Sequence, residues 1–577
     1  MAFKIITCVA LGITLTILIA AGPTCLRAAP PARSPALQPA PSPTANEVFT
    51  STRQVTALRF TDDGTLWVGT AGGVLRRAKD GMWQKFTRFS GLPSHEVRGF
   101  ETSVAGEVKV LTPRGAALWR SGHWRQWNLV PLLAKEGSGE VLSQGRNQPP
   151  PTPPLQEPVL SLPKEGEITQ TAQATWRDTT VVATLTGLRI GAGKTARLVS
   201  LPKSKGTHVS ALLPHGEKLW AALFGDGLWS FDGKTWQPLN IGLPEPAREI
   251  TALAGDDKTL WIGTRREGVW QYNGNKWTQH LQPDEPYDHN VQNLMMYGGV
   301  LFMSTLEDGL MARTGDGWKR FSELGTRKTE RGNSGLSTQH SALSSNAPRQ
   351  MVEFRGALYV RHGGQKIDRF DGGEWTRDVC SSLPRKKVMA MAADGQKLYV
   401  VQWGGWSEFD GKTWTHYLAL PELQGLPIVS LYPEGNTLWL GTVNRGLVEF
   451  DHATGKLRWH DERAGLPDDW ITSIARVGKT LYAGTFVGGL AWWDGAQWKI
   501  APQLKGENVT ALEPDGSGGV FIGTRTGLWH RAADGALEKV ETEFLDPEVQ
   551  SLCAVQGGLW VGTRTGLFFV CNRPDSR

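Results

Sequence analysis

The sequence predicts an all-β protein built from β-propeller blades, and three observations predict this fold. A strand of alternating apolar residues, a Leu-Trp-(Val/Ile/Leu)-Gly-Thr core and a Gly-(Leu/Val) pair recur along the chain. Most copies begin about 40 residues after the one before, which is the length of a four-stranded blade. Most copies also carry an Asp-Gly or Asn-Gly pair, which favours a hairpin turn, followed by a tryptophan-bearing strand. About twelve copies are present, more than one ring usually holds, so two rings are expected.

The N-terminal residues have the layout of an export signal. Lys4 precedes an apolar run from residue 5 to residue 21, and small residues follow at Ala28 and Ala29. Residues 1–28 are therefore predicted to be a signal peptide, or a membrane anchor if the leader is not cleaved. Residues 29–46 are rich in Pro and Ala and are predicted to be a tether. The predicted location is periplasmic or secreted, with the leader as the only membrane contact.

The copies divide the rest of the chain. They begin near Val55, Val97, Thr171, Val209, Ile250, Val291, Arg349, Val388, Ile428, Ile471, Val509 and Val549. The copies near Val97, Thr171 and Arg349 are degenerate. A division into six and six gives a first propeller over residues 47–324, with a Pro-rich insertion at about 134–165, a linker over 325–347 and a second propeller over 348–577. The alternative division is seven plus five.

Each recurring residue type has a structural explanation. Glycine after the apolar core leaves room for close approach of a neighbouring backbone. A tryptophan that returns at a fixed offset is expected to pack between blades rather than to bind a ligand. The second-strand series is Trp67, Trp220, Trp261, Trp439 and Trp560, and the fourth-strand series is Trp83, Trp236, Trp277, Trp318, Trp375, Trp414 and Trp498.

The repeat resembles that of the two-component regulator propeller family. The resemblance is carried by Leu-Trp-(Val/Ile)-Gly-Thr followed by Gly-Leu, and by the Gly-Leu-Pro that precedes a new copy, as at residues 91–93, 242–244, 425–427 and 465–467. It runs from about residue 48 to the C-terminus. It implies a periplasmic ligand-sensing propeller, often one that senses glycans. The chain departs from the family because only seven residues follow Val570, so we expect no kinase module.

Polar and off-register aromatic residues in the second-to-third-strand and inter-blade loops are the candidates for ligand binding. Such loops share one face of a propeller, and exposed loop residues often carry function. The candidates are Arg265, Arg266, Glu267, Asp288, His289, Asn290, Trp403, Trp406, Asn444, Arg445, Asp468, Asp469, Trp470, Arg525 and Arg564.

Motifs for catalysis are not apparent in the sequence. It contains no Gly-x-Ser-x-Gly, His-Glu-x-x-His, P-loop or dinucleotide fingerprint. We therefore expect a non-enzymatic recognition module with no cofactor and no metal. Its expected ligand is a glycan or a protein, and a separate signalling protein is a further candidate partner. The alternative is a sialidase- or lyase-like propeller enzyme acting on a polysaccharide. The net charge of +6 is small for 577 residues, and no basic cluster indicates a nucleic-acid partner.

The last copy predicts how one ring closes. It ends at its third strand, and an open blade edge would invite strand addition. Residues 47–51, just upstream of the first copy, form a short strand candidate without a blade of its own. We predict that this segment is the outer strand of the last blade. The three cysteines outside the leader region, Cys380, Cys553 and Cys571, are expected to be thiols, although Cys553 and Cys571 could pair.

Overall fold

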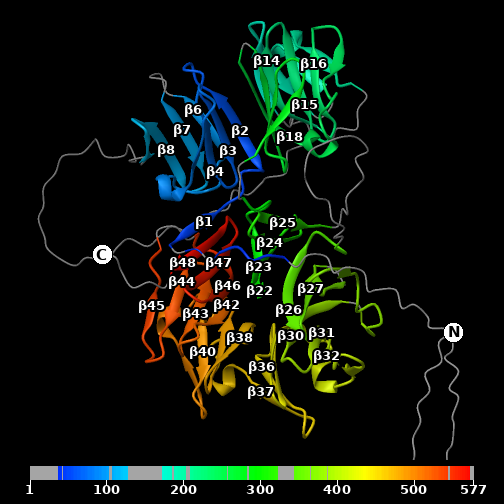
Figure 1. Cartoon of the computed structure of the whole chain (residues 1–577), viewed down its shortest axis with the longest axis vertical. Coiled ribbons are helices and arrows are strands. Elements are labelled where there is room, and N and C mark those ends of the chain that lie inside the picture. The colour runs from blue at the N-terminus through cyan, green and yellow to red at the C-terminus, as the bar shows by residue number, and fades with distance from the viewer. Residues whose placement is uncertain are drawn as a thin grey trace, which may run out of the picture.

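The structure is a computed structural model, and it describes residues 37–41, 43, 45–102, 107–127, 172–184, 187–202, 208–256, 258–281, 285–322, 343–363, 366–385, 387–542 and 546–571. These residues form twelve four-stranded antiparallel sheets, each one propeller blade. The all-β propeller prediction is thereby confirmed. The sheets lie in two groups, one above the other in Figure 1. The predicted leader and the Pro-rich insertion lie outside the described residues.

The upper group is an array of five sheets. From the inner to the outer strand they are β2 (Val55–Phe60), β3 (Leu66–Thr70), β4 (Gly73–Arg77) and β5 (Trp83–Phe86); β6 (Gly99–Thr102), β7 (Val108–Thr112), β8 (Gly115–Arg120) and β9 (His123–Trp127); β10 (Ala172–Trp176), β11 (Thr179–Ala183), β12 (Gly187–Ile190) and β13 (Arg197–Ser200); β14 (Val209–His215), β15 (Lys218–Leu223), β16 (Gly227–Phe231) and β17 (Trp236–Pro238); β18 (Ile250–Gly255), β19 (Leu260–Thr264), β20 (Val269–Tyr272) and β21 (Trp277–His280).

The lower group is a ring of seven sheets. Its strands are β22 (Val291–Tyr297), β23 (Val300–Thr305), β24 (Leu310–Thr314) and β25 (Gly317–Phe321); β26 (Pro348–Phe354), β27 (Ala357–His362), β28 (Ile367–Phe370) and β29 (Trp375–Thr376); β30 (Val388–Ala393), β31 (Leu398–Gln402), β32 (Gly405–Phe409) and β33 (Trp414–Tyr417); β34 (Ile428–Glu434), β35 (Thr437–Thr442), β36 (Leu447–Asp451) and β37 (Lys456–His460); β38 (Ile471–Val477), β39 (Thr480–Thr485), β40 (Leu490–Trp493) and β41 (Trp498–Ile500); β42 (Val509–Pro514), β43 (Val520–Thr524), β44 (Leu528–Arg531) and β45 (Leu537–Lys539); β46 (Val549–Val555), β47 (Gly558–Thr563) and β48 (Leu567–Cys571), completed by β1 (Glu47–Phe49).

Short 3-10 helices connect some of the sheets. They are η1 (Arg88–Ser90), η3 (Glu245–Arg248), η4 (Pro421–Leu423), η5 (Glu462–Ala464) and η6 (Pro502–Leu504), whereas η2 (Gly193–Thr195) lies between β12 and β13 of one sheet. Within the described part of the chain, no helix is long and apolar enough to cross a bilayer.

The repeated glycine explains how the sheets pack so closely. A Cβ added at Gly441 in β35 would lie 2.9 Å from the Cβ of Ile471, the first residue of the next inner strand. A Cβ at Gly263 in β19 would lie 2.2 Å from Cγ1 of Val55 in the same way. The inner strand of the neighbouring blade therefore packs directly against the glycine of the Gly-Thr motif. The second-strand tryptophans fill the space beside it, and Trp261 is 1% exposed.

Apolar clusters show which sheets are neighbours. In the seven-sheet ring every adjacent pair shares a cluster, including the pair β46–β48 and β22–β25 that closes the ring. In the five-sheet array such clusters join β10–β13 to β14–β17, then to β18–β21, β2–β5 and β6–β9. Among the described residues no cluster joins β6–β9 to β10–β13. The array is therefore an arc whose ends are not joined by apolar packing.

The predicted division of the chain into six and six is corrected by this packing. The sixth copy, β22–β25, belongs to the C-terminal ring, where Gln292 donates a hydrogen bond of 2.7 Å to Gln550. The two groups of sheets separate at residues 281–290 and not at the predicted linker over 325–347. A polar, low-complexity segment is a poor marker of the boundary because a long loop can also connect two blades of one ring.

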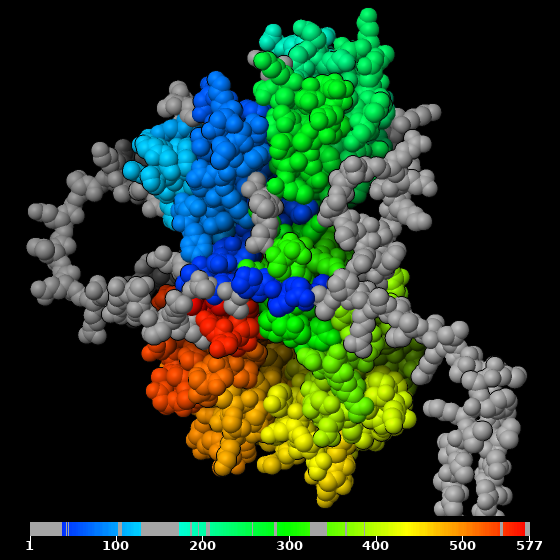
Figure 2. Space-filling view, viewed as in Figure 1, coloured from blue at the N-terminus to red at the C-terminus, as the bar shows by residue number. Residues whose placement is uncertain are grey.

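The predicted clasp is confirmed. Strand β1 pairs antiparallel with β48, placing Val48 opposite Phe568 and Phe49 opposite Leu567. Phe49 is 8% exposed and packs against Trp318 and Trp560. Figure 2 shows the blue N-terminal segment lying on the red C-terminal strands. The chain thus starts in the seven-sheet ring, builds the five-sheet array and returns.

The predicted tether over residues 29–46 is corrected in its second half. Leu37 packs beside the cluster between β22–β25 and β26–β29. Pro39 forms a bridge with Thr314, and the amide of Gly315 donates to the carbonyl of Gln38. The described residues from 37 to 46 are therefore attached to the ring. Within the described part of the chain, Cys380, Cys553 and Cys571 are not joined in a disulfide, as expected.

Candidate functional site

Two chain segments connect the array to the ring. The first segment passes between a glycine of the array and a glycine of the ring. Residues 50–54 lead from β1 to β2, and residues 281–290 lead from β21 to β22. A Cβ at Gly72, in the β3–β4 loop of the array, would lie 2.1 Å from the carbonyl oxygen of Ser51. A Cβ at Gly566, in the β47–β48 loop of the ring, would lie 2.8 Å from Cγ2 of Thr50. The second-to-third-strand loops of both groups therefore face each other across this segment.

Ion pairs link the two groups at this junction. Arg265 and Arg266 follow β19 in the array, and Glu307 and Asp308 follow β23 in the ring. The carboxylate of Glu307 accepts from Arg265 at 3.1 Å and from Arg266 at 2.9 Å, and Arg266 lies 3.5 Å from Asp308. The side chains of the two arginines and Glu307 are 33–52% exposed, so each pair contributes little, about 0–1 kcal/mol, to stability.

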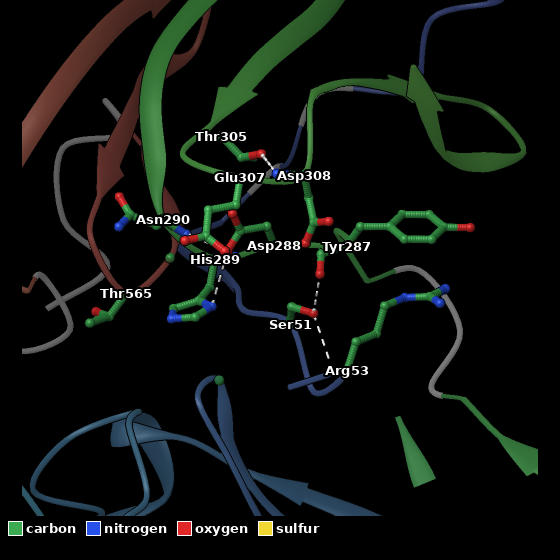
Figure 3. A network of polar contacts seen from close by, with 12 residues as sticks. Ser51, Arg53, Tyr287, Asp288, His289, Asn290, Thr305, Glu307, Asp308 and Thr565 are labelled. Carbon is green, nitrogen blue, oxygen red and sulfur yellow. Dashed lines mark hydrogen bonds and ion pairs between the residues drawn. The ribbon is translucent and has the colours of Figure 1, made fainter. Parts of the chain in front are cut away.

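The second connection places a polar turn beside these loops. The Asp288 carboxylate accepts hydrogen bonds from the backbone amides of His289 at 2.7 Å and Asn290 at 3.1 Å. Across from it, Arg320 donates to Asp308 at 2.8 Å, and the amide of Asp308 donates to the hydroxyl of Thr305. Figure 3 shows Asp288, His289 and Asn290 gathered around Glu307 and Asp308.

A cavity of about 210 Å³ opens among these groups. It is lined by Gln54, Arg265, Arg266, Tyr287, Asp288, His289, Asn290, Leu306, Glu307 and Asp308. We call it the junction cavity. Five predicted site residues line it: Arg265, Arg266, Asp288, His289 and Asn290. Loops of the array, loops of the ring and the chain segments between them all contribute to its wall.

Burial changes the protonation of groups in and near the cavity. Burial raises the pKa of the Asp308 carboxyl, and the neighbouring Asp288 adds to this effect although Arg320 opposes it. Burial likewise raises the pKa of Glu267, the sixth predicted residue of this region, whose carbonyl accepts from Gln279 at 2.9 Å. Burial lowers the pKa of His289, which favours the neutral ring. The cavity therefore brings arginine side chains together with acids that are partly shielded from water.

Further polar contacts of the junction were missed at the sequence level. Lys85 and Glu285 form an ion pair of 2.7 Å, and Arg114 and Asp546 form another of 2.7 Å. His95 is 1% exposed, and both its ring nitrogens lack a hydrogen-bond partner among the described residues. Burial, with Arg88 and other nearby cations, lowers its pKa to about 3. Lys85 lies in β5 and the others occupy ordinary loop positions. They come together only because the two groups of sheets face each other.

Four other predicted residues lie together elsewhere on the ring. The Trp470 ring stacks on Phe486 with centroids 4.0 Å apart, and the guanidinium of Arg525 lies 5.9 Å from the Phe486 ring. The Asp468 carboxylate accepts from the backbone amides of Trp470 at 3.0 Å and of Val487 at 2.8 Å. Asp469 accepts from the amide of Glu462 at 2.9 Å. The two aspartates thus order the loops that hold the aromatic pair.

The remaining candidates are scattered. Arg445 lies 4.3 Å from the ring centroid of Trp459, and the neighbouring Asn444 is exposed. Arg564 pairs with Glu548 at 3.2 Å. Trp403 is 43% exposed, with the Lys387 ammonium 5.6 Å from its ring. None of these residues lines the junction cavity.

Trp406 is wrong as a ligand-binding candidate. It is fully buried, its ring stacks on Tyr417 at 4.7 Å, and its indole N–H donates to Glu408 at 2.9 Å. Its position in β32 opposite Val401 makes it a core residue of the blade. It lies outside the tryptophan series because it belongs to the third strand, where it packs in the same cluster as Tyr399, the residue at the second-strand tryptophan position.

Glu307 and Asp308 could have been found from the sequence. They occupy the second-to-third-strand loop of their copy, at the positions that Arg266 and Glu267 occupy in the preceding copy. Comparing loop residues of adjacent copies would have shown the opposite charges of Arg266 and Glu307 at equivalent positions. Within the described residues, no group of three or more His, Cys, Asp or Glu side chains is arranged to hold a metal ion.

Solved structures with the same fold come from several kinds of protein. PorZ of Porphyromonas gingivalis, described as an essential bacterial surface component of the type-IX secretion system, is 14% identical with a TM-score of 0.59, covering 91% of this chain and 87% of that chain. The extracellular domain of a proposed hybrid two component system of B. thetaiotaomicron, BT4673, is 14% identical with a TM-score of 0.42, covering 90% and 70%. A GH74 enzyme of Niastella koreensis is 11% identical with a TM-score of 0.44, covering 92% and 100%.

No protein-family model and no curated protein sequence matches the chain. At these low identities the structural likeness establishes the propeller fold. The repeat motif remains a resemblance to the two-component regulator propellers, whose extracellular domains are among the structural matches.

Proposed function

We propose that the protein is a non-catalytic recognition protein that works outside the cytoplasm and binds a glycan or a protein in the junction cavity. The observation that carries this proposal is the convergence of Arg265 and Arg266 from the array, Glu307 and Asp308 from the ring, and Asp288 from the connection on one cavity. A site built from two propellers places charged donors and acceptors on several sides of one bound group. Such convergent polar groups are typical of ligand sites.

The size and chemistry of the cavity limit what it could hold. Its volume of about 210 Å³ is below the roughly 300–1,000 Å³ of sites for drug-sized ligands. We infer that it takes one sugar unit of a glycan or one side chain of a protein partner. Arginines offer several N–H donors and carboxylates offer acceptors, so a group with hydroxyls or a polar side chain would match both.

The arrangement of the acids favours binding over catalysis. Glycoside hydrolysis needs two carboxyl groups that are free to act on the substrate from its two sides. Here Asp288 accepts from two backbone amides, Glu307 accepts from two arginines and Asp308 accepts from Arg320. A carboxylate already held by such partners is not free to reach a substrate. This pairing supports a recognition role.

The proposed location follows from the sequence. Lys4 with the apolar run after it is typical of an exported protein. PorZ, which shares the fold at a TM-score of 0.59, is itself a surface component. We infer a periplasmic or secreted protein, and a separate signalling or surface protein is then a suitable partner.

Binding and product analysis on the same samples test the proposal. The full chain is mixed with a panel of neutral, acidic and amino-sugar oligosaccharides, its melting is followed by fluorescence, and the same mixtures are analysed for cleaved sugar by chromatography. A melting shift without product supports recognition of a glycan. Released product would contradict the non-catalytic role and favour the polysaccharide-acting alternative. If no sugar shifts the melting, envelope proteins captured by cross-linking are the next ligands to test.

A matched pair of variants locates the binding. Arg266→Gln removes a charge that lines the cavity, and we expect the ligand affinity to fall about 10-fold or more, because a hydrogen bond to a charged group contributes roughly 1.5–3 kcal/mol. Arg177→Gln is the control, because Arg177 also lies beside a glutamate, Glu217, but on the array outside the cavity. Equal affinities for the two variants would place the site elsewhere.

A further inference from the structure

Two arginines lie at the inner edge of the seven-sheet ring, away from the residues that line the junction cavity. Arg349 belongs to β26, the innermost strand of its sheet, which lies beside the innermost strands β22 and β30 of the neighbouring sheets. The pairing of β26 with β27 is irregular at this residue, so Arg349 has no regular partner in the register. Arg361 belongs to β27 and pairs with Gln350 of β26. Both guanidinium groups are thus carried by one blade beside the central channel.

Arg361 occupies a position where the repeat normally has no side chain. In β27 the residues Leu-Tyr-Val-Arg-His replace Leu-Trp-Val-Gly-Thr, so Arg361 stands where Gly441 stands in β35. A Cβ at Gly441 would meet the first inner residue of the next blade. In the blade of Arg361, the corresponding first inner residue of the next blade is Val388, and Arg361 donates a hydrogen bond to its carbonyl at 3.5 Å. This blade has accommodated a long cation in place of the packing glycine.

The hydrogen-bond partners of the two arginines are neutral. Arg349 donates to the side-chain oxygen of Gln292 at 2.6 Å, and Arg361 donates to that of Gln350 at 3.4 Å. Gln292 in turn donates to Gln550 at 2.7 Å. Across the ranges that the structure describes, neither arginine forms an ion pair with a carboxylate. The side-chain amides of Gln292, Gln350 and Gln550, which come from three blades, carry no charge. The two positive charges therefore have no counter-ion among the described residues.

The surroundings of Arg361 disfavour its charge. Burial and, second, the positive charge of Arg349 together lower the pKa of its guanidinium to about 10. Two guanidinium groups that repel each other beside neutral acceptors are costly unless an anion joins them. A guanidinium offers a planar set of N–H donors that matches the oxygens of a carboxylate, phosphate or sulfate group.

We propose that Arg349 and Arg361 together bind an oxyanion at the inner edge of the seven-sheet ring. The ligand is a carboxylate, phosphate or sulfate group, either free or carried by a larger molecule. Gln292 and Gln350 hold the two guanidinium groups in place from the neighbouring strands. The site is independent of the junction cavity, although Gln292 also donates to Asn290, which lines that cavity, at 2.8 Å.

Titration of the full chain with small anions tests this site. Phosphate, sulfate and acetate are each titrated by calorimetry at constant ionic strength, with chloride as the reference anion. We expect saturable binding at one site per chain. Saturation by phosphate or sulfate assigns an ester or inorganic oxyanion, and saturation by acetate alone assigns a carboxylate. Either result supports the proposal, and the absence of saturable binding by all three overturns it.

Substitutions separate this site from general surface charge. Arg349→Gln and Arg361→Gln are each expected to weaken anion binding about 10-fold or more, as loss of a charge-assisted hydrogen bond should. Arg361→Gly is a second variant, which restores the glycine that the repeat normally has at this position. It allows the site to be tested if the glutamine variant does not fold. The control is Arg458→Gln, because Arg458 is an arginine of the same ring whose side chain is 65% exposed.

Two outcomes of these titrations decide the proposal. Unchanged anion affinity in Arg349→Gln and in both Arg361 variants, each with the parent melting temperature, would overturn it. Arg266→Gln, which alters the junction cavity, should leave the anion affinity unchanged. A loss of anion binding in Arg266→Gln with none in the Arg361 variants would likewise overturn it, because the anion would then lie in the junction cavity.

Discussion

Burial decides which tryptophans of this protein are structural. Trp261 in the regular series is 1% exposed, and Trp406 outside the series is fully buried. Trp403, three residues before Trp406, is 43% exposed. An off-register position in the sequence therefore does not distinguish a core tryptophan from a surface one, because a third-strand tryptophan such as Trp406 can also pack in the core.

Replacing Trp406 by Ala should destabilise the ring strongly. Loss of a fully buried tryptophan typically costs about 3–5 kcal/mol, and here the indole also bonds to Glu408. Trp403→Ala, the matched control, should change the free energy of unfolding by less than about 0.5 kcal/mol. Denaturant unfolding of both variants measures this. Similar stabilities for the two would contradict the assignment of Trp406 to the core.

A buried ion pair near Trp406 should make stability depend on pH. His452 lies 2.5 Å from the carboxylate of Glu408, whose side chain is 1% exposed. The hydrogen bond that His452 donates to Glu408 raises the pKa of His452. Burial opposes ionisation of Glu408, but bonds from His452 and Lys397 outweigh it and leave its pKa lowered. The histidine contribution is present below the unfolded pKa of about 6.5 and is lost as the pH rises through the raised folded value.

The difference in free energy of unfolding between the parent and His452→Gln tests the direction of this pH dependence. The difference should be largest between about pH 5 and pH 6.5 and should shrink above that range, because the charged imidazole is the form that the folded state favours. The contribution of Glu408 to the free energy of unfolding has the opposite pH dependence. It is lost only as the pH falls below the ordinary range of a glutamate. Urea unfolding at several pH values measures both the histidine and the glutamate contribution. A difference that grows from pH 6 to pH 9 would refute the assignment.

At the scale of single elements, strand β1 explains why the two ends of the chain meet. Val48 and Phe49 complete the last blade from the start of the chain. The sequence indicated this because a blade with three strands and a strand without a blade were both visible. The boundary between the two groups of sheets was less visible. It depends on packing of β22 against β46, and nothing in the local pattern near Val291 differs from other copies.

Deleting residues 1–51 should destabilise the seven-sheet ring although the deletion is remote from it in sequence. The deletion removes β1 and with it Phe49, which packs against Trp318 and Trp560. It also exposes the edge of β48 to strand addition. Deleting residues 1–36 only is the control, because it leaves β1 and the attached residues from Leu37 onward. Melting of the two truncated chains measures the effect. Equal melting temperatures would contradict the clasp.

At the scale of the whole molecule, the array and the ring face each other through their loop surfaces. Most of the candidate residues that meet there, such as Arg265 and Asp288, were predicted as loop residues, but their meeting was not. Their proximity depends on two connections that hold the array over one side of the ring. A repeat pattern determines the blade but carries no information on how two groups of blades are oriented. The aromatic pair Trp470 and Phe486, on other blades of the ring, is not part of the junction cavity.

Removing the charge of Glu307 should loosen the arrangement of the two groups without unfolding either. Glu307→Gln removes the ion pairs with Arg265 and Arg266. Because the three side chains are partly exposed, the stability change should stay within about 1 kcal/mol. Spin labels at Thr235→Cys in the array and Thr413→Cys in the ring, with Cys571→Ser, report the distance between them.

The distance distribution should broaden in Glu307→Gln and should remain narrow in the control Glu217→Gln, whose glutamate pairs with Arg177 within the array. A distribution as narrow as that of the parent would show that the junction does not depend on these ion pairs. The tight passage of residues 50–51 past Gly72 and Gly566 would then be the main constraint on orientation.

Hydrogen exchange of the full chain with and without its bound ligand tests the central claim most directly. The ligand is the oligosaccharide or the captured envelope protein that passes the binding test. If the junction cavity is the recognition site, protection should appear together at residues 264–268 of the array, 285–291 of the connection and 305–309 of the ring. Protection confined to residues 442–446, 468–470 and 524–527 of the ring, with none at the junction, would contradict it.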